Sequence, residues 1–295
     1  MNNTSKNVTS NKQPKVGVVL GGGGLKSLAA IALFEFLNEA NIGIDLLVGS
    51  SGGSIIAALH GAGYNSSQMH DFITKVSEKE LSRNIDYRSL ASIAKLPFGR
   101  FNKSCGILKA DPIRRIYRRI FSDLRLENLQ PKTILQVTDY QTGEGHILTS
   151  GLVADAVYAS GAMFPILPPI CIDGSWYIDG GYSSNVPIME AIKRNMDVII
   201  AVVLQEHLSP DPQGFLECFF TVQKTLTRAL VRSQISLSVE LHHHEIVIIN
   251  VPFDKYIQVW DVNEVPEILN AGQSAVDEKK DEILSVIKSF QKEKK

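Results

Sequence analysis

The first sixty residues alternate short apolar runs with longer segments in which apolar residues recur at helical spacing. Lys15–Leu20 and Ile44–Val48 have the length and composition of buried strands. Leu25–Asn41 and Ser54–His60 follow them and are predicted to be helices. Strands that alternate with helices indicate a parallel sheet covered by helices on its faces. We therefore predict an α/β fold, a three-layer α/β/α sandwich with a mainly parallel central sheet.

The rest of the chain continues this pattern without an internal repeat or a Pro/Gly/Ser-rich linker. We therefore expect one domain over residues 15–295, after a disordered tail over residues 1–14 that is rich in Asn, Ser and Thr. Phe215, Phe219, Val222, Leu226 and Leu230 mark one face of a long amphipathic helix. Further strands are predicted at Thr133–Thr138, His146–Thr149, Pro168–Ile172, Ser175–Ile178, Val198–Leu204 and Glu245–Val251.

Composition narrows the classes of function. The net charge is −1, so there is no global basic field to attract nucleic acid. Cys105, Cys171 and Cys218 are odd in number and far apart, which favours a reduced, cytoplasmic protein over a disulfide framework or a zinc knuckle. The N-terminus lacks the apolar core of a signal peptide, and no apolar run is long enough to span a membrane. The sequence predicts neither a metal nor a cofactor.

A Gly/Ser-rich turn lies between the second predicted strand and the helix after it, and it contains Ser50, Ser51 and Ser54. Only Ser51 has a glycine two positions before it and another two positions after it, Gly49 and Gly53. A G-x-S-x-G turn places its serine in a tight strand-to-helix bend, where flanking side chains would clash. We expect the Ser51 hydroxyl to be exposed at the carboxyl edge of the sheet, beside a helix N-terminus. The alternative is a Gly/Ser loop that only caps the helix.

The first predicted strand ends in a run of glycines that includes Gly22, Gly23 and Gly24. Backbone N–H groups without side chains around them are what an oxyanion hole requires. Dinucleotide binding is the rival interpretation. The G-x-G-x-x-G pattern fails, because Lys26 or Ser27 stands where its last glycine is needed.

The base that activates Ser51 is expected to be a carboxylate or a histidine. Asp173 and Asp179 are each followed by glycine. Asp173 fits the two-residue turn of a hairpin, which explains it without a catalytic role. Asp179 follows the second strand of that hairpin. It is either a turn residue, or a carboxylate that the two glycines after it allow to approach another loop closely.

Three blocks of the sequence resemble motifs of the patatin-like phospholipases. They are Gly22–Ser27 (G-G-G-x-[RK]-G), Gly49–Gly53 (the nucleophile elbow) and Asp179–Gly181 (D-G-[GA]). Ala159–Pro165 and Asn185–Pro187 resemble the family's segments before and after the aspartate. The likeness extends from about Lys15 to the final helix. In this extent the chain resembles the compact bacterial form of the family. It departs from the pattern at Ser27, where the family has glycine and where a helix begins in this sequence.

The resemblance implies that Ser51 is the nucleophile and that Asp179 is the base that takes its proton directly. It implies that N–H groups of Gly22, Gly23 and Gly24 form the oxyanion hole. The reaction implied is hydrolysis of a lipid acyl ester, such as a phospholipid, through an acyl-enzyme. The other motif residues support these roles: Lys26, Gly49, Gly53, Gly180 and Gly181.

Two other functions remain open. An α/β-hydrolase has a triad in the chain order Ser, Asp, His, and His207 or His242–His244 come late enough to supply its histidine. The histidine run precedes a predicted strand in a polar stretch, which favours a surface position. The second alternative is a catalytically silent patatin fold that acts in signalling or membrane association.

Two features concern the membrane. Arg114, Arg115, Arg118 and Arg119 share one helical face, which is either solvated or contacts lipid phosphates. Leu90–Phe101 is an irregular apolar stretch, either a packed loop or a lid that contacts lipid. The expected partners are a lipid substrate and the inner membrane surface, met from the cytoplasm as a peripheral protein. The sequence leaves the oligomeric state open.

Overall fold

The computed structural model describes residues 13–75, 84–93, 95–205, 208, 211–241, 245–257 and 261–293. Of the predicted tail, residues 1–12 lie outside the described residues. The strands are β1 (Val16–Leu20), β2 (Leu46–Ser50), β3 (Lys132–Asp139), β4 (Gly145–Leu148), β5 (Ile170–Ile172), β6 (Ser175–Asp179), β7 (Val198–Leu204) and β8 (Glu245–Val251).

These strands form one sheet in the order β5-β6-β3-β2-β1-β7-β8, with β4 also paired to β3. The pairs that join β3, β2, β1, β7 and β8 are parallel. The pairs that involve β4, β5 and β6 are antiparallel. The prediction of a mainly parallel central sheet is therefore confirmed, with an antiparallel extension at one end.

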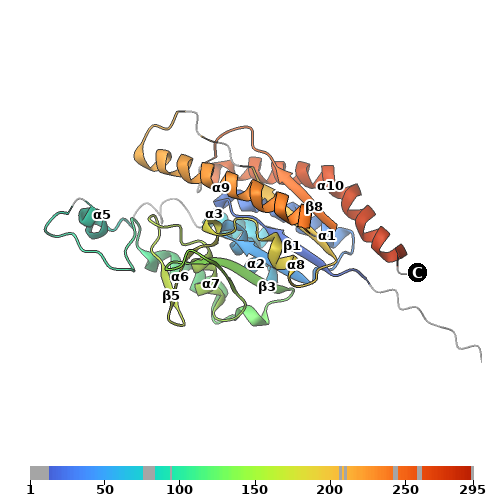
Figure 1. Ribbon diagram of the computed structural model, residues 1–295, viewed down its shortest axis with the longest axis horizontal. Coiled ribbons are helices and arrows are strands. Elements are labelled where there is room, and N and C mark those ends of the chain that lie inside the picture. Colours follow the sequence, from blue (N-terminus) through green and yellow to red (C-terminus); the bar gives the residue numbers. More distant parts are fainter. Residues whose placement is uncertain are drawn as a thin grey trace, which may run out of the picture.

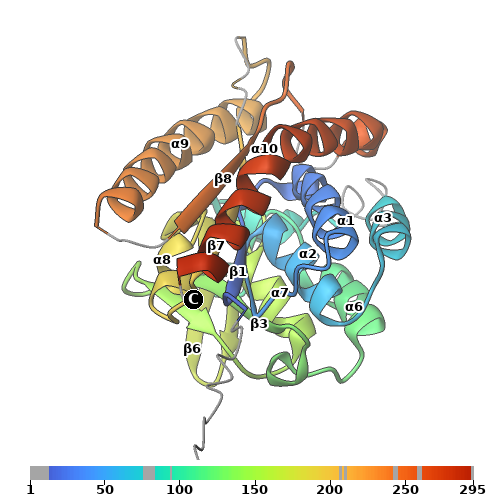
Figure 2. The same cartoon turned by 90° about the vertical axis from the view of Figure 1, so that its right-hand side faces the viewer.

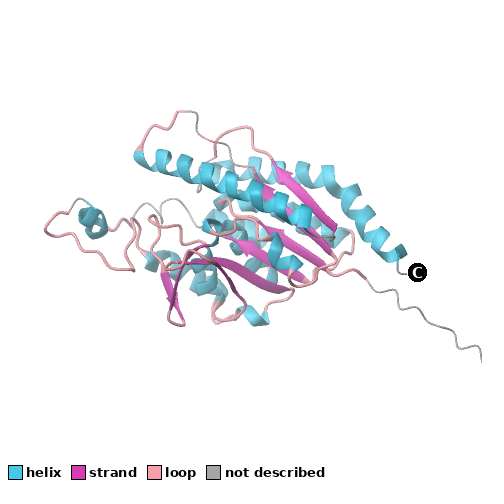
Figure 3. Cartoon of the chain, viewed as in Figure 1, coloured by secondary structure: helices cyan, strands magenta, loops and turns pink. Residues whose placement is uncertain are grey.

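Helices connect the strands (Figures 1 and 3). They are η1 (Gly24–Ala30), α1 (Ile31–Glu39), α2 (Gly52–Gly61), α3 (Ser66–Lys75), α5 (Tyr87–Ile93), α6 (Ala110–Phe121), η2 (Leu126–Asn128), α7 (Val153–Ser160), η3 (Gly180–Tyr182), α8 (Ile188–Ile192), α9 (Phe215–Leu241), η4 (Val262–Glu264) and α10 (Val265–Glu293).

The sheet lies between two layers of helices, as Figure 2 shows with α8 and α9 on one side and α1, α2 and α6 on the other. Side chains alternate between the two faces of a strand. In β7, Ile200 and Val202 join the core under α1, α2 and α10. Ile199 and Ala201, from the same strand, join the core under α8 and α9. The three-layer α/β/α sandwich predicted from the sequence is thus the observed architecture.

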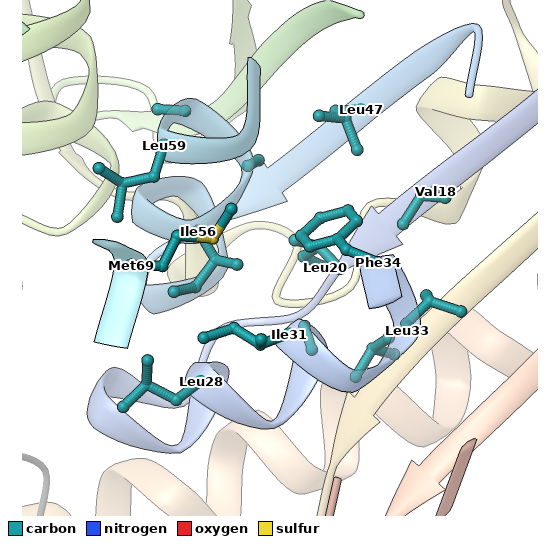
Figure 4. Close-up of a cluster of buried hydrophobic side chains, with 14 of the residues drawn as sticks. Val18, Leu20, Leu28, Ile31, Leu33, Phe34, Leu47, Ile56, Leu59 and Met69 are labelled. Atoms are coloured by element: carbon teal, nitrogen blue, oxygen red, sulfur yellow. The ribbon is translucent and has the colours of Figure 1, made fainter. Parts of the chain in front are cut away.

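The larger core joins η1 and α1 to the first two strands and to α2 (Figure 4). Leu28 and Leu33 are fully buried there against Leu20 and Leu47. The segment Leu25–Asn41 was expected to be one α-helix, but its first part, η1, is a 3-10 helix. The tighter winding lets the chain turn directly out of the glycine run and into the core.

The predicted long amphipathic helix is α9, and its apolar face lies largely outside. Val222 and Leu226 are exposed by 60% and 62%, whereas Phe219 and Leu230 are half-buried. The inner face instead carries Phe220 and Val231, both buried, together with polar residues. Residue periodicity identified an apolar face correctly, but the face that covers the sheet is the opposite one.

Helix α5 and the loop after it form an arm that projects away from the sheet (Figure 1). Ala91 is buried and Leu90 is half-buried, but the larger apolar side chains of the arm are exposed. Phe98 and Phe101 are each exposed by 64%, and Tyr87 and Ile93 are also exposed. The interpretation of Leu90–Phe101 as an ordinary packed loop is therefore wrong.

Candidate active site

The turn between β2 and α2 holds Ser51 in a backbone conformation that is unusual for serine, with φ 49° and ψ −123°. The turn is tight because its glycines touch other backbone atoms. A Cβ on Gly53 would lie 2.3 Å from the Leu20 carbonyl oxygen, and one on Gly49 would lie 2.6 Å from Ser54 Cα. The strained φ at Ser51 and these close approaches are the geometry of a nucleophile elbow.

The three serines of this turn have different surroundings. Ser50 Oγ donates to the Ser184 carbonyl oxygen at 2.9 Å, and Ser54 Oγ donates to the Ser51 carbonyl oxygen at 2.6 Å. Both serines are fully buried, whereas Ser51 is 9% exposed and lines a pocket. Ser51 is less exposed than the sequence led us to expect, because other parts of the chain cover the pocket.

The register of β3 explains how Asp179 reaches Ser51. Gln136 of β3 pairs with Ser50 on one side and Ile147 on the other. The next residue, Val137, pairs with His146 of β4 on that same other side, so its partner on the first side, the side of β2, is Asp179 of β6. Strands β2 and β6 therefore lie along the same edge of β3 and meet end to end. Ser51 and Asp179 are the residues at which they meet.

Ser51 Oγ donates a hydrogen bond to Asp179 Oδ2 at 2.7 Å, and the Gly181 N–H donates to Asp179 Oδ1 at 2.7 Å. Asp179 is 3% exposed. Burial raises the pKa of its carboxyl to about 6, although both hydrogen bonds favour the charged form and oppose this rise. A carboxylate with this pKa and this contact can accept the serine proton near neutral pH.

Asp173 has no part in this arrangement. It lies exposed in the turn between β5 and β6, where it and Gly174 have φ angles of 49° and 86°. Positive φ at both central residues is typical of a type I′ hairpin turn, which agrees with the structural role predicted for Asp173.

The glycine run passes directly over Ser51, and a Cβ on Gly22 would lie 2.8 Å from Ser51 Cβ. The Gly22 N–H, expected to be an oxyanion donor, instead donates to the Asn185 carbonyl oxygen at 3.0 Å. Within the described part of the chain, the Gly23 and Gly24 N–H groups make no hydrogen bond, and both residues line the pocket. The expectation for Gly22 is thus corrected, because its donor is already used.

The departure from the family pattern at Ser27 is accommodated. Ser27 is buried within η1, and its Oγ donates to the Gly21 carbonyl oxygen at 3.4 Å. The close contact is made possible by Gly52, where a Cβ would lie 2.6 Å from Ser27 Oγ. The preceding residue, Lys26, is 3% exposed and lines the pocket, with its Nζ 5.5 Å from the centre of the Phe253 ring.

Two further residues support the site, and the sequence reasoning gave them no role. Ser160 Oγ accepts from the Ser51 N–H at 3.0 Å and donates to the Gln136 carbonyl oxygen at 2.7 Å, so it ties the elbow to β3. Asn185 accepts from the Gly22 N–H through its backbone, and its Nδ2 donates to the Gly22 carbonyl oxygen at 3.3 Å. Both lie in segments that resemble family motifs, which was the available signal.

The pocket over Ser51 encloses about 650 Å³, part of it open to solvent. Helix α9 forms one wall with four residues. Gln223 Nε2 donates to Tyr182 Oη at 3.3 Å, and Gln234 Nε2 donates to the Ser183 carbonyl oxygen at 2.8 Å. These bonds tie α9 to the loop after Asp179. The residues of α9 in the wall are Phe220, Gln223, Lys224 and Thr227.

The alternative interpretation of Leu90–Phe101, a lid over the site, places it at this pocket, but no described residue of that stretch lines the pocket. The arginine face of α6 is partly engaged within the protein. Arg114 and Arg118 lie 3.1 and 3.6 Å from the Asp155 carboxylate on α7, whereas Arg115 and Arg119 are exposed.

The histidines considered for a triad, His207 and His242–His244, lie outside the described residues. No histidine is among the described residues that line the Ser51 pocket. Residues 13–75, 84–93, 95–205, 208, 211–241, 245–257 and 261–293 contain no group of three or more His, Cys, Asp or Glu side chains placed to hold a metal. Over the same residues, no helix has the length and apolar character needed to cross a bilayer.

The fold and the site together define an α/β protein with a serine–aspartate pair under a glycine-lined pocket. Comparison with known families assigns it further. The chain belongs to the patatin-like phospholipase family, whose sequence pattern matches residues 18–192.

Curated relatives are fungal lysophospholipases. The chain is 30% identical over 205 residues to lysophospholipase NTE1 of Phaeosphaeria nodorum, and 29% identical over 215 residues to lysophospholipase nte1 of Aspergillus oryzae. These alignments cover 68% and 70% of this chain, but only 13% of each relative. The chain thus matches a small part of those longer proteins.

Solved structures share the fold. VipD from Legionella pneumophila superposes with a TM-score of 0.53 at 14% identity, over 92% of this chain and 67% of that one. Human GIVD cytosolic phospholipase A2, in complex with methyl gamma-linolenyl fluorophosphonate, superposes with a TM-score of 0.51 at 11% identity, over 99% of this chain and 61% of that one. At these identities the likeness confirms the fold.

Proposed function

We propose that this protein is a serine acyl hydrolase that cleaves lipid acyl esters with a Ser51–Asp179 dyad. The observation that carries the proposal is the 2.7 Å hydrogen bond from Ser51 Oγ to the buried Asp179 carboxylate, at an elbow where Ser51, and neither Ser50 nor Ser54, lines the pocket. Family membership supports the same reaction class.

In the proposed acylation step, Asp179 takes the Ser51 proton as Oγ attacks the ester carbonyl carbon. The tetrahedral intermediate carries its negative charge on the former carbonyl oxygen. The N–H groups of Gly23 and Gly24 are the proposed donors to that oxygen. As the intermediate collapses, Asp179 returns the proton to the leaving alcohol, and the acyl group remains on Ser51.

In the proposed deacylation step, Asp179 takes a proton from a water molecule, which attacks the acyl-enzyme carbonyl. Collapse of the second intermediate releases the fatty acid, and Asp179 returns the proton to Ser51 Oγ. The turn that carries Ser51 and the loop after Asp179 can approach closely because both contain glycines, namely Gly49, Gly53, Gly180 and Gly181. The dyad needs no metal or cofactor for these steps.

The proposed substrate class is a phospholipid or lysophospholipid acyl ester. The relatives named lysophospholipase support it, and so does a pocket wall that contains Met163 and Phe220 beside Lys26. We also propose that the chain represents the compact bacterial form of the family, as one catalytic domain over residues 15–295 that follows a tail over residues 1–14. The continuous core from β1 to α10 supports the single domain.

We further propose that the protein works in the cytoplasm as a peripheral protein at the inner membrane surface. Its cysteines are free, which suits a reducing compartment. Two exposed apolar surfaces support bilayer contact: the arm, with Phe98 and Phe101, and the outer face of α9, with Val222 and Leu226.

A fluorophosphonate probe tests the dyad. We expect it to label Ser51 alone, and Ser51→Ala to lose both labelling and hydrolysis while the melting temperature stays close to that of the wild type. Ser54→Ala is the matched control in the same turn, and it should still be labelled. Labelling that persists in Ser51→Ala would reject the assignment. A protein that hydrolyses no ester would favour the catalytically silent alternative, and loss of activity in His207→Ala would favour the triad.

A further inference from the structure

The arm that projects from the sheet (Figure 1) combines exposed apolar side chains with a concentration of positive charge. Residues 84–119, which run from the arm into α6, contain nine Lys or Arg and two Asp, whereas the whole chain has 30 Lys or Arg and 31 Asp or Glu. The preceding residues 76–83 add two of each sign and leave this balance unchanged. The segment is therefore strongly basic and the remainder of the chain is acidic. Such a charge distribution orients a protein in front of an anionic surface.

The loop of the arm is held in its shape by its own backbone. The Arg100 N–H donates to the Arg88 carbonyl oxygen at 3.3 Å, so the loop folds back on α5. Gly99 permits this close approach, because a Cβ on it would lie 2.5 Å from a backbone nitrogen of α5. The exposed rings of Phe98 and Phe101 are thus presented to solvent by a defined backbone.

Basic side chains stand on both sides of these rings. Lys95 and Arg100 flank Phe98 and are exposed, and no ion pair in the described part of the chain involves either of them. Lys103 is also exposed, with its Nζ 6.0 Å from the centre of the Trp176 ring. Apolar side chains bordered by cations match the two layers of an anionic bilayer, because its acyl region accepts the rings while its phosphates meet the cations.

The base of the arm is joined to the segment beside the Ser51 pocket. The Leu108 N–H donates to the Ile166 carbonyl oxygen at 2.8 Å. Met163, three residues before Ile166, lines the pocket. A bilayer that binds the arm is therefore held close to the pocket that contains Ser51.

Other partners and surfaces fit these features less well. An isologous dimer through the arm would place the same positive surface on both copies, which would repel each other. Nucleic acid offers phosphates but no apolar layer for the exposed side chains of Leu96 and Phe98. The second exposed apolar surface, on α9, lacks the excess of positive charge, since Phe215–Leu241 contains three Lys or Arg and two Glu.

We propose that the arm is the membrane-docking element of the protein and that it selects anionic phospholipid bilayers over zwitterionic ones. This inference deepens the proposed acyl hydrolase function and rests on it for the substrate that the bilayer supplies. Docking brings the Ser51 pocket to the lipid surface. The charge of the bilayer therefore controls the hydrolysis of membrane lipids and leaves the hydrolysis of dissolved esters unaffected.

Cosedimentation with vesicles of diether phospholipids tests the docking, since these lipids contain no acyl ester that the protein could hydrolyse. Vesicles of equal parts phosphatidylcholine and phosphatidylglycerol should bind the wild type, and vesicles of phosphatidylcholine alone should bind it about 10-fold or more weakly. Raising the ionic strength from about 0.1 M to about 1 M should remove most of this difference, because the Debye length falls from about 10 Å to about 3 Å. Equal binding to both kinds of vesicle, or binding to anionic vesicles that salt does not weaken, would overturn the proposal.

Lys95→Gln combined with Arg100→Gln removes two cations of the arm. We expect binding to the anionic vesicles to weaken by about 10- to 30-fold, since each Lys or Arg near such a surface strengthens binding about fivefold. Lys132→Gln combined with Lys288→Gln is the matched control, because it removes the same charge from exposed positions in β3 and α10. An equal loss in the control would show that the overall charge, and not the arm, determines binding.

Arg228→Gln combined with Arg232→Gln makes the same change in charge on α9, and a loss as large as that of the arm variant would reject the arm as the docking element. Hydrolysis of a soluble short-chain ester by the arm variant should match the wild type, since neither Lys95 nor Arg100 lines the Ser51 pocket. The outcomes separate the two proposals. An active arm variant that binds anionic vesicles as tightly as the wild type rejects docking by the arm, whereas hydrolysis that survives Ser51→Ala rejects the dyad.

Discussion

Ser51 and Asp179 are separated by 128 positions in the chain, and their side chains are joined by a 2.7 Å hydrogen bond. The contact arises because β2 and β6 end against the same edge of β3. Two backbone ladders therefore set the distance between the proposed nucleophile and its base. The predictions below follow from this contact and from the surfaces around the pocket.

Asp179→Asn keeps the shape of the side chain and removes the base. We expect kcat to fall by about 10²- to 10⁴-fold, the usual effect of losing a general base. Asp173→Asn is the matched control, because Asp173 lies in the exposed hairpin turn six residues earlier and should retain most activity. The measurement is steady-state hydrolysis of a soluble short-chain ester, and equal losses in the two variants would show that the dyad is misassigned.

The activity should depend on pH through Asp179. Since burial raises the pKa of this carboxyl to about 6, kcat/KM should increase with pH up to about 6 and then level off. A histidine base would give a similar midpoint, and a water-miscible organic solvent separates the two. Ionisation of a carboxyl group creates charge and that of an imidazolium does not, so the midpoint should move to higher pH in the solvent. A midpoint that stays still would indicate a histidine.

The same pKa makes a prediction about stability. The folded protein holds a proton on Asp179 up to about pH 6, whereas the unfolded chain releases it near 3.8. Stability from this group is therefore present below pH 3.8 and is lost as pH rises to about 6. A shift of this size corresponds to about 3 kcal/mol. At pH 7.5, Asp179→Asn should unfold at higher urea concentration than the wild type, by up to that free energy.

The control for this experiment is pH. Near pH 4 the wild-type carboxyl is already protonated in the folded state, so the advantage of Asp179→Asn should largely disappear there. An advantage of the same size at both pH values would indicate that the substitution acts through packing and not through the buried charge.

The exposed arm makes a prediction about the membrane. Replacing Phe98 and Phe101 with serine should lower hydrolysis of vesicle phospholipid by about 10-fold or more, because apolar side chains supply binding to the acyl region. Hydrolysis of a soluble short-chain ester should change little, since neither residue lines the pocket. Leu124→Ser, at another exposed apolar position, is the control. Parallel losses on vesicles and soluble ester would reject membrane contact by the arm.

Much of the fold could be predicted from the sequence, because local patterns determine it. The bounds of β7 and β8 were predicted to the residue, and the spacing of glycines around Ser51 selected one serine of three. The shared edge of β3 could not be predicted, because no local signal shows that two strands meet end to end. The face of α9 that covers the sheet could not be predicted for a related reason: periodicity shows which face is apolar, not which face another element covers.

Strand β3 bridges the break between β2 and β6, and the helix that forms a wall of the pocket, α9, is attached elsewhere in the chain, after β7. Helix α9 can therefore change in composition while the register that joins Ser51 to Asp179 stays the same. For an engineer, this makes α9 the exchangeable wall of the pocket, and the arm between α3 and α6, which does not line the pocket, a separately exchangeable surface.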